Sequence, residues 1–155
     1  MAHEAEHEGY LVSDDPARID AAVWHEYLQR SYWAAGMARP LLEKGNRHSL
    51  CVGVYAPPTG GVRPMVGGGR VITDRATFAY LSDVFVLEGH RGRGLSKAMM
   101  ACILSHPDLQ GLRRFALFTR DAQGLYARFG FGPCPHPDRY MERRGQAGAS
   151  GDGVC

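Results

Sequence analysis

The segment from Val84 to Lys97 holds residues whose types and spacing could do chemistry. An apolar run ends there in a turn of glycine and basic residues, Arg91-Gly92-Arg93-Gly94-Leu95-Ser96-Lys97, which we call the glycine turn. The residues that follow it predict a helix over 96–105. Backbone N–H groups at a helix N-terminus bind anions, and glycine lets that backbone approach a phosphate closely. The glycine turn therefore predicts a pyrophosphate site; a plain strand-to-helix connection is the alternative.

Two well-known phosphate motifs do not fit the glycine turn. A dinucleotide-binding fingerprint needs a third glycine, which does not follow Gly92 and Gly94 at the required spacing. A P-loop places lysine before serine or threonine, whereas the order here is Ser96 and then Lys97. Phosphate binding here needs a different scheme.

A second motif occurs further along the chain, Ala122-Gln123-Gly124-Leu125-Tyr126-Ala127-Arg128-Phe129-Gly130-Phe131. With it, the chain resembles the GNAT superfamily of acyl-CoA-dependent N-acyltransferases. The pyrophosphate loop of that family reads R/Q-x-x-G-x-G/A, which the glycine turn matches except at Ser96, and its later motif reads roughly A-x-x-L-Y-x-x-x-G-F. The resemblance is close from Phe78 to Phe131, and upstream it extends only to the order of the elements.

The resemblance implies acetyl-CoA as cosubstrate. The cofactor-binding residues would be Arg91, Gly92, Arg93, Gly94, Leu95, Ser96 and Lys97, together with Val84, Phe85 and Val86. In the family the latter stretch pairs its backbone with the pantetheine arm, and one of its N–H groups polarises the thioester carbonyl. Ser96 replaces the usual glycine or alanine, and its hydroxyl would cap the helix or bond a phosphate oxygen.

Tyr126 matches the family tyrosine that protonates the departing CoA thiolate. A phenol and a thiol have similar enough pKa values for useful proton transfer. The alternative is structural, because Tyr126 lies on an apolar stripe with Ala122, Leu125 and Phe129 at helical spacing. The resemblance favours the acid role.

Asp83 interrupts an otherwise apolar strand, where a carboxylate is costly unless it is paired or used. It could deprotonate the acceptor amine, directly or through water, or anchor a cationic acceptor. It could instead accept hydrogen bonds from its own strand or from an arginine such as Arg70. The chain departs from the family here: Tyr80 stands where histone-type members carry a catalytic glutamate, and Ser82-Asp83 stands where polyamine-type members carry an acidic pair. His48, Glu26 and a water chain are the fallback bases.

The acceptor site should form from the first helix and the loop after it, as in the family. Tyr32, Trp33 and Ser82 are the expected acceptor-binding residues, whereas Trp24 and Tyr27 are expected in the core.

The order of elements predicts an α/β (α+β) single-domain fold. We expect strands near 9–12, 50–55, 65–73, 77–87, 114–119 and 140–143, and helices near 17–32, 40–44, 96–105 and 122–129. The strand over 77–87 is apolar on both sides, which predicts a central strand covered by helices. The resemblance implies a mixed, mostly antiparallel sheet, splayed at the cofactor site and flanked by helices.

Length, composition and net charge indicate how many domains the chain has, which partners it binds and where it works. A chain of 155 residues with 45% apolar residues is one domain, expected over 9–144, with flexible tails at 1–8 and 145–155. A net charge of +2 argues against nucleic acid as a partner, and no apolar run is long enough to span a membrane. The scattered cysteines indicate reduced thiols in a cytoplasmic protein. We expect no metal, even though His3 and His7 are spaced to share a helix face.

These observations together predict an acetyl-CoA-dependent N-acetyltransferase that acts by direct attack of a small-molecule primary amine, with Tyr126 as general acid and Asp83 as first choice of base. The alternatives are an acetyltransferase of proteins or peptides and a non-catalytic acyl-CoA-binding module or sensor. Homodimers are common among relatives, so a homodimer is one expected state. The acceptor, the acyl-chain length and the base stay open.

Overall fold

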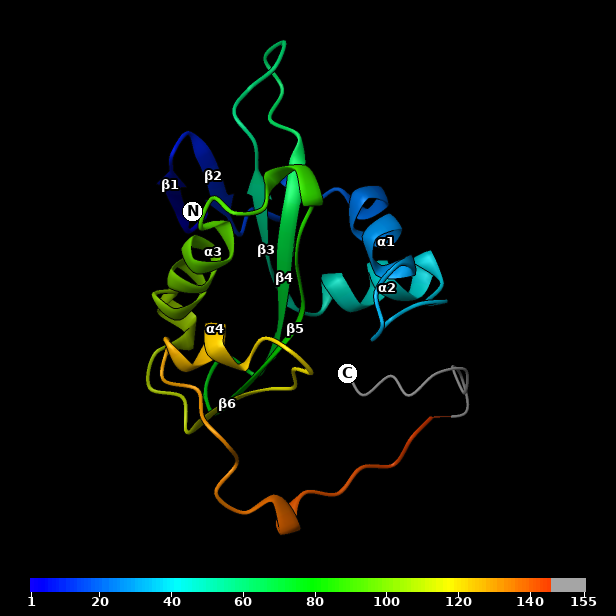
Figure 1. The fold of residues 1–155 in the computed structure, drawn as a ribbon, viewed down its shortest axis with the longest axis vertical. Helices are drawn as coiled ribbons and strands as arrows, with labels where there is room; N and C mark the ends of the chain where they lie inside the picture. The colour runs from blue at the N-terminus through cyan, green and yellow to red at the C-terminus, as the bar shows by residue number, and fades with distance from the viewer. Residues whose placement is uncertain (146–155) are drawn as a thin grey trace.

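The protein folds around one six-stranded sheet with strands in the order β1-β2-β3-β4-β5-β6 (Figure 1). The computed structural model describes residues 1–145. Neighbouring strands are antiparallel, except for the parallel pair of β5 and β6. The strands are β1 (Glu4–His7), β2 (Tyr10–Ser13), β3 (Leu50–Tyr55), β4 (Met65–Thr73), β5 (Phe78–Val86) and β6 (Arg114–Leu117). The predicted α/β fold with a mixed, mostly antiparallel sheet is confirmed.

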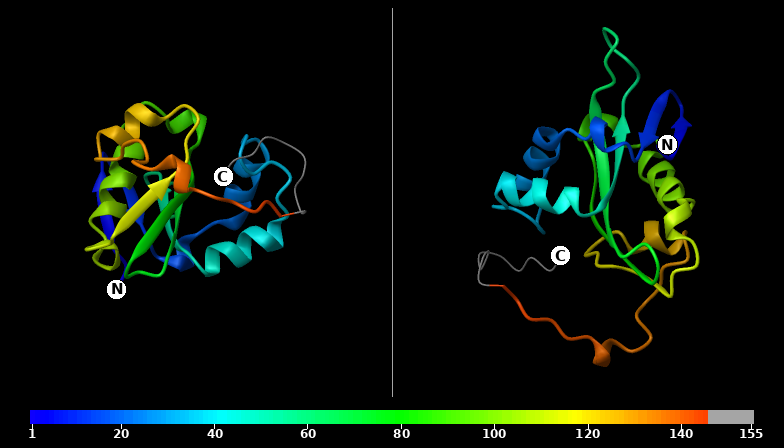
Figure 2. Two further views of the ribbon diagram at one scale, coloured as in Figure 1. Left: turned by 90° about the horizontal axis from the view of Figure 1, so that it is seen from below. Right: turned by 180° about the vertical axis from the view of Figure 1, so that it is seen from behind.

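Helices cover both faces of the sheet (Figures 1 and 2). They are α1 (Ala21–Gln29), α2 (Arg39–Arg47), α3 (Leu95–Leu104) and α4 (Gln123–Ala127). α3 and α4 pack on one face over a core that contains Val52, Met99 and Ile103. α1 and α2 pack on the other face over a second core, which contains Trp24 and Leu28. No helix within residues 1–145 combines the length and apolar character that crossing a lipid bilayer requires.

Local sequence explains most element boundaries. β3 and β4 have the predicted bounds, and along β3 the side chains alternate between the two cores, as strand geometry requires. The first helix is shorter than predicted. The Asp20 side chain accepts hydrogen bonds from the N–H groups of Ala22 and Val23, so α1 starts at Ala21, and residues before it form only a 3-10 turn over Pro16–Arg18.

A β-bulge in β5 opens the sheet. Arg70 of β4 pairs with Ser82 and Gly68 pairs with Phe85, so Gly69 alone faces the two residues Asp83 and Val84. The bulge shifts the side-chain alternation of β5 by one. β5 and β6 pair only over Phe78–Leu81 and Arg114–Leu117, and they part beyond that point. The expected splay is present, but β5 is the fifth of six strands and not a central one; the bulge brings its apolar residues to both cores.

The prediction of a flexible tail over residues 1–8 is wrong. Residues 4–7 form β1, which pairs with β2 around a tight turn. Glu8 and Gly9 both have positive φ (48° and 82°), as in the type I′ turns that join antiparallel strands. The acidic, histidine-rich composition concealed this edge strand, which packs against α3.

The strand predicted over 140–143 is absent. Residues 140–143 pair with no strand, and the proline-rich segment before them, which contains Pro133, Pro135 and Pro137, forms only a 3-10 turn over Pro137–Arg139. Tyr140 still touches the body of the protein, with its ring centroid 5.4 Å from that of Phe118. The predicted tail over 145–155 lies, beyond residue 145, outside the described residues.

Replacing Gly67 with alanine should destabilise the fold by about 2 kcal/mol, the usual cost of overpacking. An added Cβ would lie 2.7 Å from the carbonyl oxygen of Phe85, so β4 would have to move away from β5 beside the bulge. Urea unfolding measures the change. The control is Gly124→Ala in α4, where no atom lies within 4 Å of an added Cβ; it should leave stability unchanged or raise it slightly. Equal losses in both variants would contradict the steric explanation.

Two buried thiols should make the fold sensitive to alkali. Burial raises the pKa of Cys51 to about 12, although Arg70 lowers it in part, and burial raises the pKa of Cys102 to about 11. A thiol of the unfolded chain ionises near pH 8.5, so the stabilisation is complete below that pH and is lost above it at about 1.4 kcal/mol per pH unit and thiol.

The slope of unfolding free energy against pH, measured from about pH 9 to about pH 11, should therefore become shallower in Cys51→Ala. Cys134 is exposed, and Cys134→Ala should keep the wild-type slope. An unchanged slope in Cys51→Ala would show that the thiol is not protected from ionisation.

Candidate active site

The glycine turn follows β5 and leads directly into α3. Gly92 and Gly94 have φ values of 76° and 74°, a region that side chains disfavour, so both positions require glycine. Gly94 is the N-cap of α3, and the helix begins at Leu95, one residue earlier than predicted. Leu95 is buried and anchors the first helical turn, whereas Arg93 and Lys97 are exposed. The N-terminus of α3 is thus presented to solvent beside positive charge, as a phosphate site requires.

The Arg91 side chain contacts the protein itself, and Ser96 does not cap α3 as one alternative from the sequence had it. Arg91 Nε donates to the carbonyl oxygen of Val86 at 2.9 Å, and its Nη2 donates to the hydroxyl of Tyr27 at 3.2 Å. Arg91 therefore fastens the glycine turn to the end of β5 and to α1. Ser96 is not the cap, because Gly94 occupies that position and α3 has no side-chain cap hydrogen bond.

The end of β5 offers backbone groups to the gap between β5 and β6. The N–H of Leu87 donates to Val66 of β4, so the N–H and the C=O of Val86, one residue earlier, point away from β4. The C=O of Val86 accepts from Arg91. The N–H faces the side where β6 no longer pairs, which is the side that an extended ligand could occupy.

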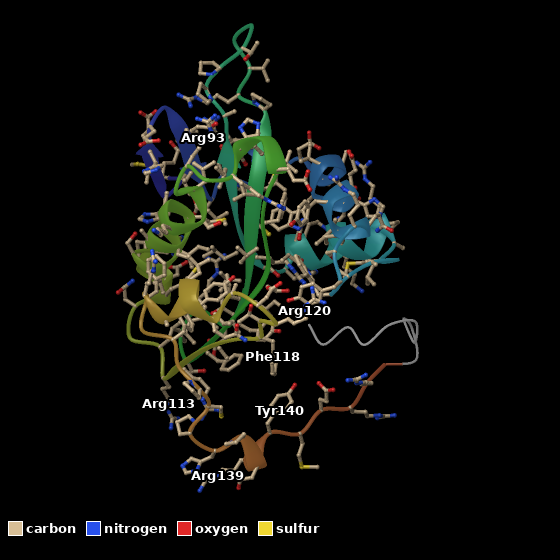
Figure 3. All side chains as sticks on the ribbon, in the orientation of Figure 1. Arg93, Arg113, Phe118, Arg120, Arg139 and Tyr140 are labelled. Carbon is tan, nitrogen blue, oxygen red and sulfur yellow. The ribbon has the colours of Figure 1, made fainter. Side chains whose placement is uncertain are left out.

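The catalytic and acceptor residues expected from the sequence meet in one pocket of about 100 Å³ where β5 and β6 part. Its lining includes the predicted residues Tyr32, Trp33, Ser82, Asp83, Val84 and Tyr126. The glycine turn does not line it and lies at the other end of the splayed edge, where Figure 3 labels Arg93; Arg120 and Phe118 mark the pocket end. A larger hollow of about 840 Å³ lies between the N-terminus and α2, and none of the predicted site residues lines it.

Asp83 is bound from several sides. Its Oδ2 accepts from Arg70 Nε at 2.9 Å, and its Oδ1 accepts from Trp33 Nε1 at 3.1 Å and from the Ser82 hydroxyl at 3.2 Å. Only 2% of the Asp83 side chain is exposed, and 14% of that of Arg70. This is a buried, hydrogen-bonded ion pair, in agreement with the arginine alternative considered from the sequence. It also connects the bulge to the loop that carries Trp33.

Tyr126 is a buried residue of α4, and its side chain forms part of the pocket wall. Burial, with smaller contributions from the nearby Tyr32 and Asp121, raises the pKa of its phenol to about 12. The phenol therefore keeps its proton through the physiological range. The ring also packs edge-on against Phe131 with centroids 6.1 Å apart, and Tyr126 belongs to the core over which α3 packs, so it has a structural role as well.

Sequence reasoning missed several residues at the site. Asp121 lines the pocket, and its side chain is 67% exposed with Arg120 Nη2 at 3.8 Å. The Arg120 guanidinium carbon lies 3.9 Å from the centroid of the Tyr32 ring, a cation–π contact at the rim. Their position directly after a strand that ends at the splay was the available signal. Among residues 1–145, no three His, Cys, Asp or Glu side chains gather as metal ligands would.

Comparison with known proteins agrees with this geometry. The model of the acetyltransferase (GNAT) family matches residues 12–131, which is most of the chain. The protein belongs to the GNAT acetyltransferase family. It is therefore an acyltransferase, and the match includes both motifs quoted above.

Individual relatives of this GNAT acetyltransferase support the assignment. A crystal structure of a GNAT-family protein from Xanthomonas campestris pv. campestris is 47% identical, covers 90% of this chain and 95% of its own, and superposes with a TM-score of 0.83. A Gibberella zeae protein named as an acetyltransferase is 33% identical, over 77% of this chain and 76% of its own length. A Clostridium acetobutylicum structure determined with acetyl-CoA shares the fold at 13% identity and a TM-score of 0.57, covering 87% of this chain and 94% of its own.

Asp83→Asn should lower the free energy of unfolding by about 3–5 kcal/mol, because it leaves the Arg70 guanidinium buried without its counter-charge. Asparagine tolerates the positive φ of 55° at this position, so the substitution isolates the charge. In a double-mutant cycle with Arg70→Met, the double variant should lose much less than the sum of the single losses. The exposed Arg39–Glu43 pair is the control, and Glu43→Gln should cost well under about 1 kcal/mol. Additive losses would contradict the buried pair.

Proposed function

We propose that this acetyltransferase moves an acetyl group from acetyl-CoA to the primary amine of a small molecule. The main support for the proposal is how the pocket, the strand edge and the glycine turn are arranged. One splayed strand edge runs from a pocket with Tyr126 and Asp83 to the glycine turn at the start of α3. That edge has the extended form that a pantetheine arm needs, with a thioester at one end and a pyrophosphate at the other.

The residues of this chain fit acetyl-CoA. The glycine turn offers the exposed backbone of a helix N-terminus, and Arg93 and Lys97 lie beside it for charge. At Gly92 no atom lies within 4 Å of an added Cβ, so space is open on that side. The N–H of Val86 faces the splay and can pair with an amide of the pantetheine arm. The acetyl-CoA in the Clostridium acetobutylicum relative adds support by analogy of fold.

In the proposed reaction the amine attacks the acetyl carbonyl directly, and the bond from carbon to sulfur then breaks. A backbone N–H of β5 near Val84 stabilises the negative charge that develops on the carbonyl oxygen. The Tyr126 phenol donates its proton to the departing sulfur, which leaves as a thiol. The amine loses a proton to a base, and the products are an amide and CoA.

The identity of the base stays a prediction. Asp83 lines the pocket, and its two carboxylate oxygens already accept hydrogen bonds from Arg70 and Trp33, which compete with a proton from the amine. These contacts favour a structural role for Asp83, which is to hold the bulge of β5 and the Trp33 side chain in place. Asp121 at the rim has no comparable buried partner and can attract a cationic amine before water removes its proton.

The size of the pocket supports a small acceptor. A volume of about 100 Å³ admits only the amine end of an acceptor and a short apolar stem. Tyr32 and Trp33 form an aromatic wall, with ring centroids 5.0 Å apart. We therefore favour an aryl-alkyl or other apolar primary amine over a peptide, whose backbone would need a longer groove.

The test is acetyl-CoA consumption, read as thiol release, over a panel of acceptors. The panel contains aryl-alkyl amines, polyamines, amino acids, aminoglycosides and short peptides. Turnover on a small amine supports the proposal, and turnover on peptides alone replaces it with a protein acetyltransferase. CoA binding without turnover on any acceptor would favour a binding module.

Tyr126→Phe should lower kcat about 100-fold at neutral pH with little change in the affinity for CoA, because only the proton donor is lost. The wild type should show no alkaline loss of activity from Tyr126 itself until the pH approaches about 12, since the acid must be protonated and its pKa is raised to that value. The pH profile of kcat measures both points. Tyr140→Phe, in the C-terminal segment, is the matched control. An unaltered kcat in Tyr126→Phe would leave only the structural role.

A further inference from the structure

We infer that the N-terminal hairpin of β1 and β2 positions the glycine turn through His7 and Tyr10, and so sets the affinity for the pyrophosphate of CoA. His7 Nε2 lies 2.8 Å from the carbonyl oxygen of Arg93, and the Tyr10 hydroxyl lies 2.9 Å from His90 Nδ1. The two contacts hold the start and the centre of the connection between β5 and α3. The inference rests on the proposed acetyl-CoA site.

The hairpin is built to present these two side chains together. His7 and Tyr10 are direct partners in the antiparallel register, so their side chains project from the same face of the ribbon. The turn between them is fixed by the positive φ values of Glu8 and Gly9. Figure 3 shows Arg93 beside this hairpin, at the start of α3.

The contact of His7 orients one peptide group. A carbonyl can only accept, so His7 Nε2 carries the proton and donates it to Arg93. The peptide that follows is planar and trans, which makes its C=O and its N–H point in opposite directions. His7 therefore turns the N–H of Gly94 away from the hairpin and toward the open side of the turn, where an anion would bind.

Gly94 is adapted to this neighbour. Its φ of 74° disfavours any side chain, and an added Cβ would lie 3.3 Å from His7 Nε2. Tyr10 is buried and bonds the ring of His90, which precedes the turn. The backbone of the turn is thus ordered before a ligand arrives, and a preordered site loses less entropy on binding.

The experiment measures CoA binding by calorimetry in the full-length protein. His7→Ala should raise the Kd for CoA about tenfold, the equivalent of one hydrogen bond. His7→Gln should recover part of the affinity, because its amide N–H can donate to the same carbonyl. Tyr10→Phe should weaken binding less, since it frees only the entry to the turn.

A spectroscopic readout separates positioning from general destabilisation. In His7→Ala saturated with CoA, the phosphorus-31 resonances of the bound pyrophosphate should move from their wild-type positions toward those of free CoA. His3→Ala is the matched control, because His3 bonds Ser105 at the far end of α3 and does not touch the turn. It should keep both the affinity and the resonances of the wild type.

Three results would overturn the inference, and they are distinguishable. If the wild type binds CoA but His7→Ala keeps its affinity and its phosphorus resonances, the hairpin has no positioning role and the proposed function stands. Equal changes in His7→Ala and His3→Ala would likewise reduce the effect to loss of the N-terminal strand. If the wild type does not bind CoA, the positioning role of the hairpin is contradicted together with the proposed acetyl-CoA site.

Discussion

The ion pair between Asp83 and Arg70 holds the bulge on which the rest of the site depends. Asp83 has a positive φ of 55° inside a strand, a conformation that costs of order 1–3 kcal/mol without glycine. Its carboxylate is also buried, which is costly unless the charge is matched. The bonds from Arg70, Trp33 and Ser82 offset both costs. The extra residue that they stabilise ends the pairing between β5 and β6, and the pocket lies where the strands part.

The same bulge determines what β4 must be. Gly69 faces two residues of β5, and Gly67 lies so close to Phe85 that a side chain would displace the strand. An added Cβ at Gly68 would lie 3.0 Å from the ring of Trp24 in α1. The glycines of β4 are therefore not a weakness in the strand. They let β4 lie close to α1 on one side and to the bent strand β5 on the other.

The limits of sequence reasoning follow from the range of each interaction. Alternation over β3 and β4 is a local property, so their bounds were predictable, and the motifs around Gly94 and Tyr126 predicted the candidate site. The partners of Asp83 are distant in the chain, and a contact between Trp33 and Asp83 leaves no local pattern. β1 was missed because an edge strand covered on one side can be polar, and its only local signal was the turn at Glu8-Gly9.

The charge balance of the pocket bears on how an amine could react there. Arg70 neutralises Asp83, so the floor of the pocket is polar but carries little net charge. The exposed Asp121 leaves the negative charge at the rim, next to Arg120. An ammonium group would be held best at the rim and would enter the aromatic interior more easily as a neutral amine. That order of events, proton loss before entry, suits direct attack, because only the neutral amine is a nucleophile. In the proposed reaction, Tyr126 keeps its proton until the sulfur departs.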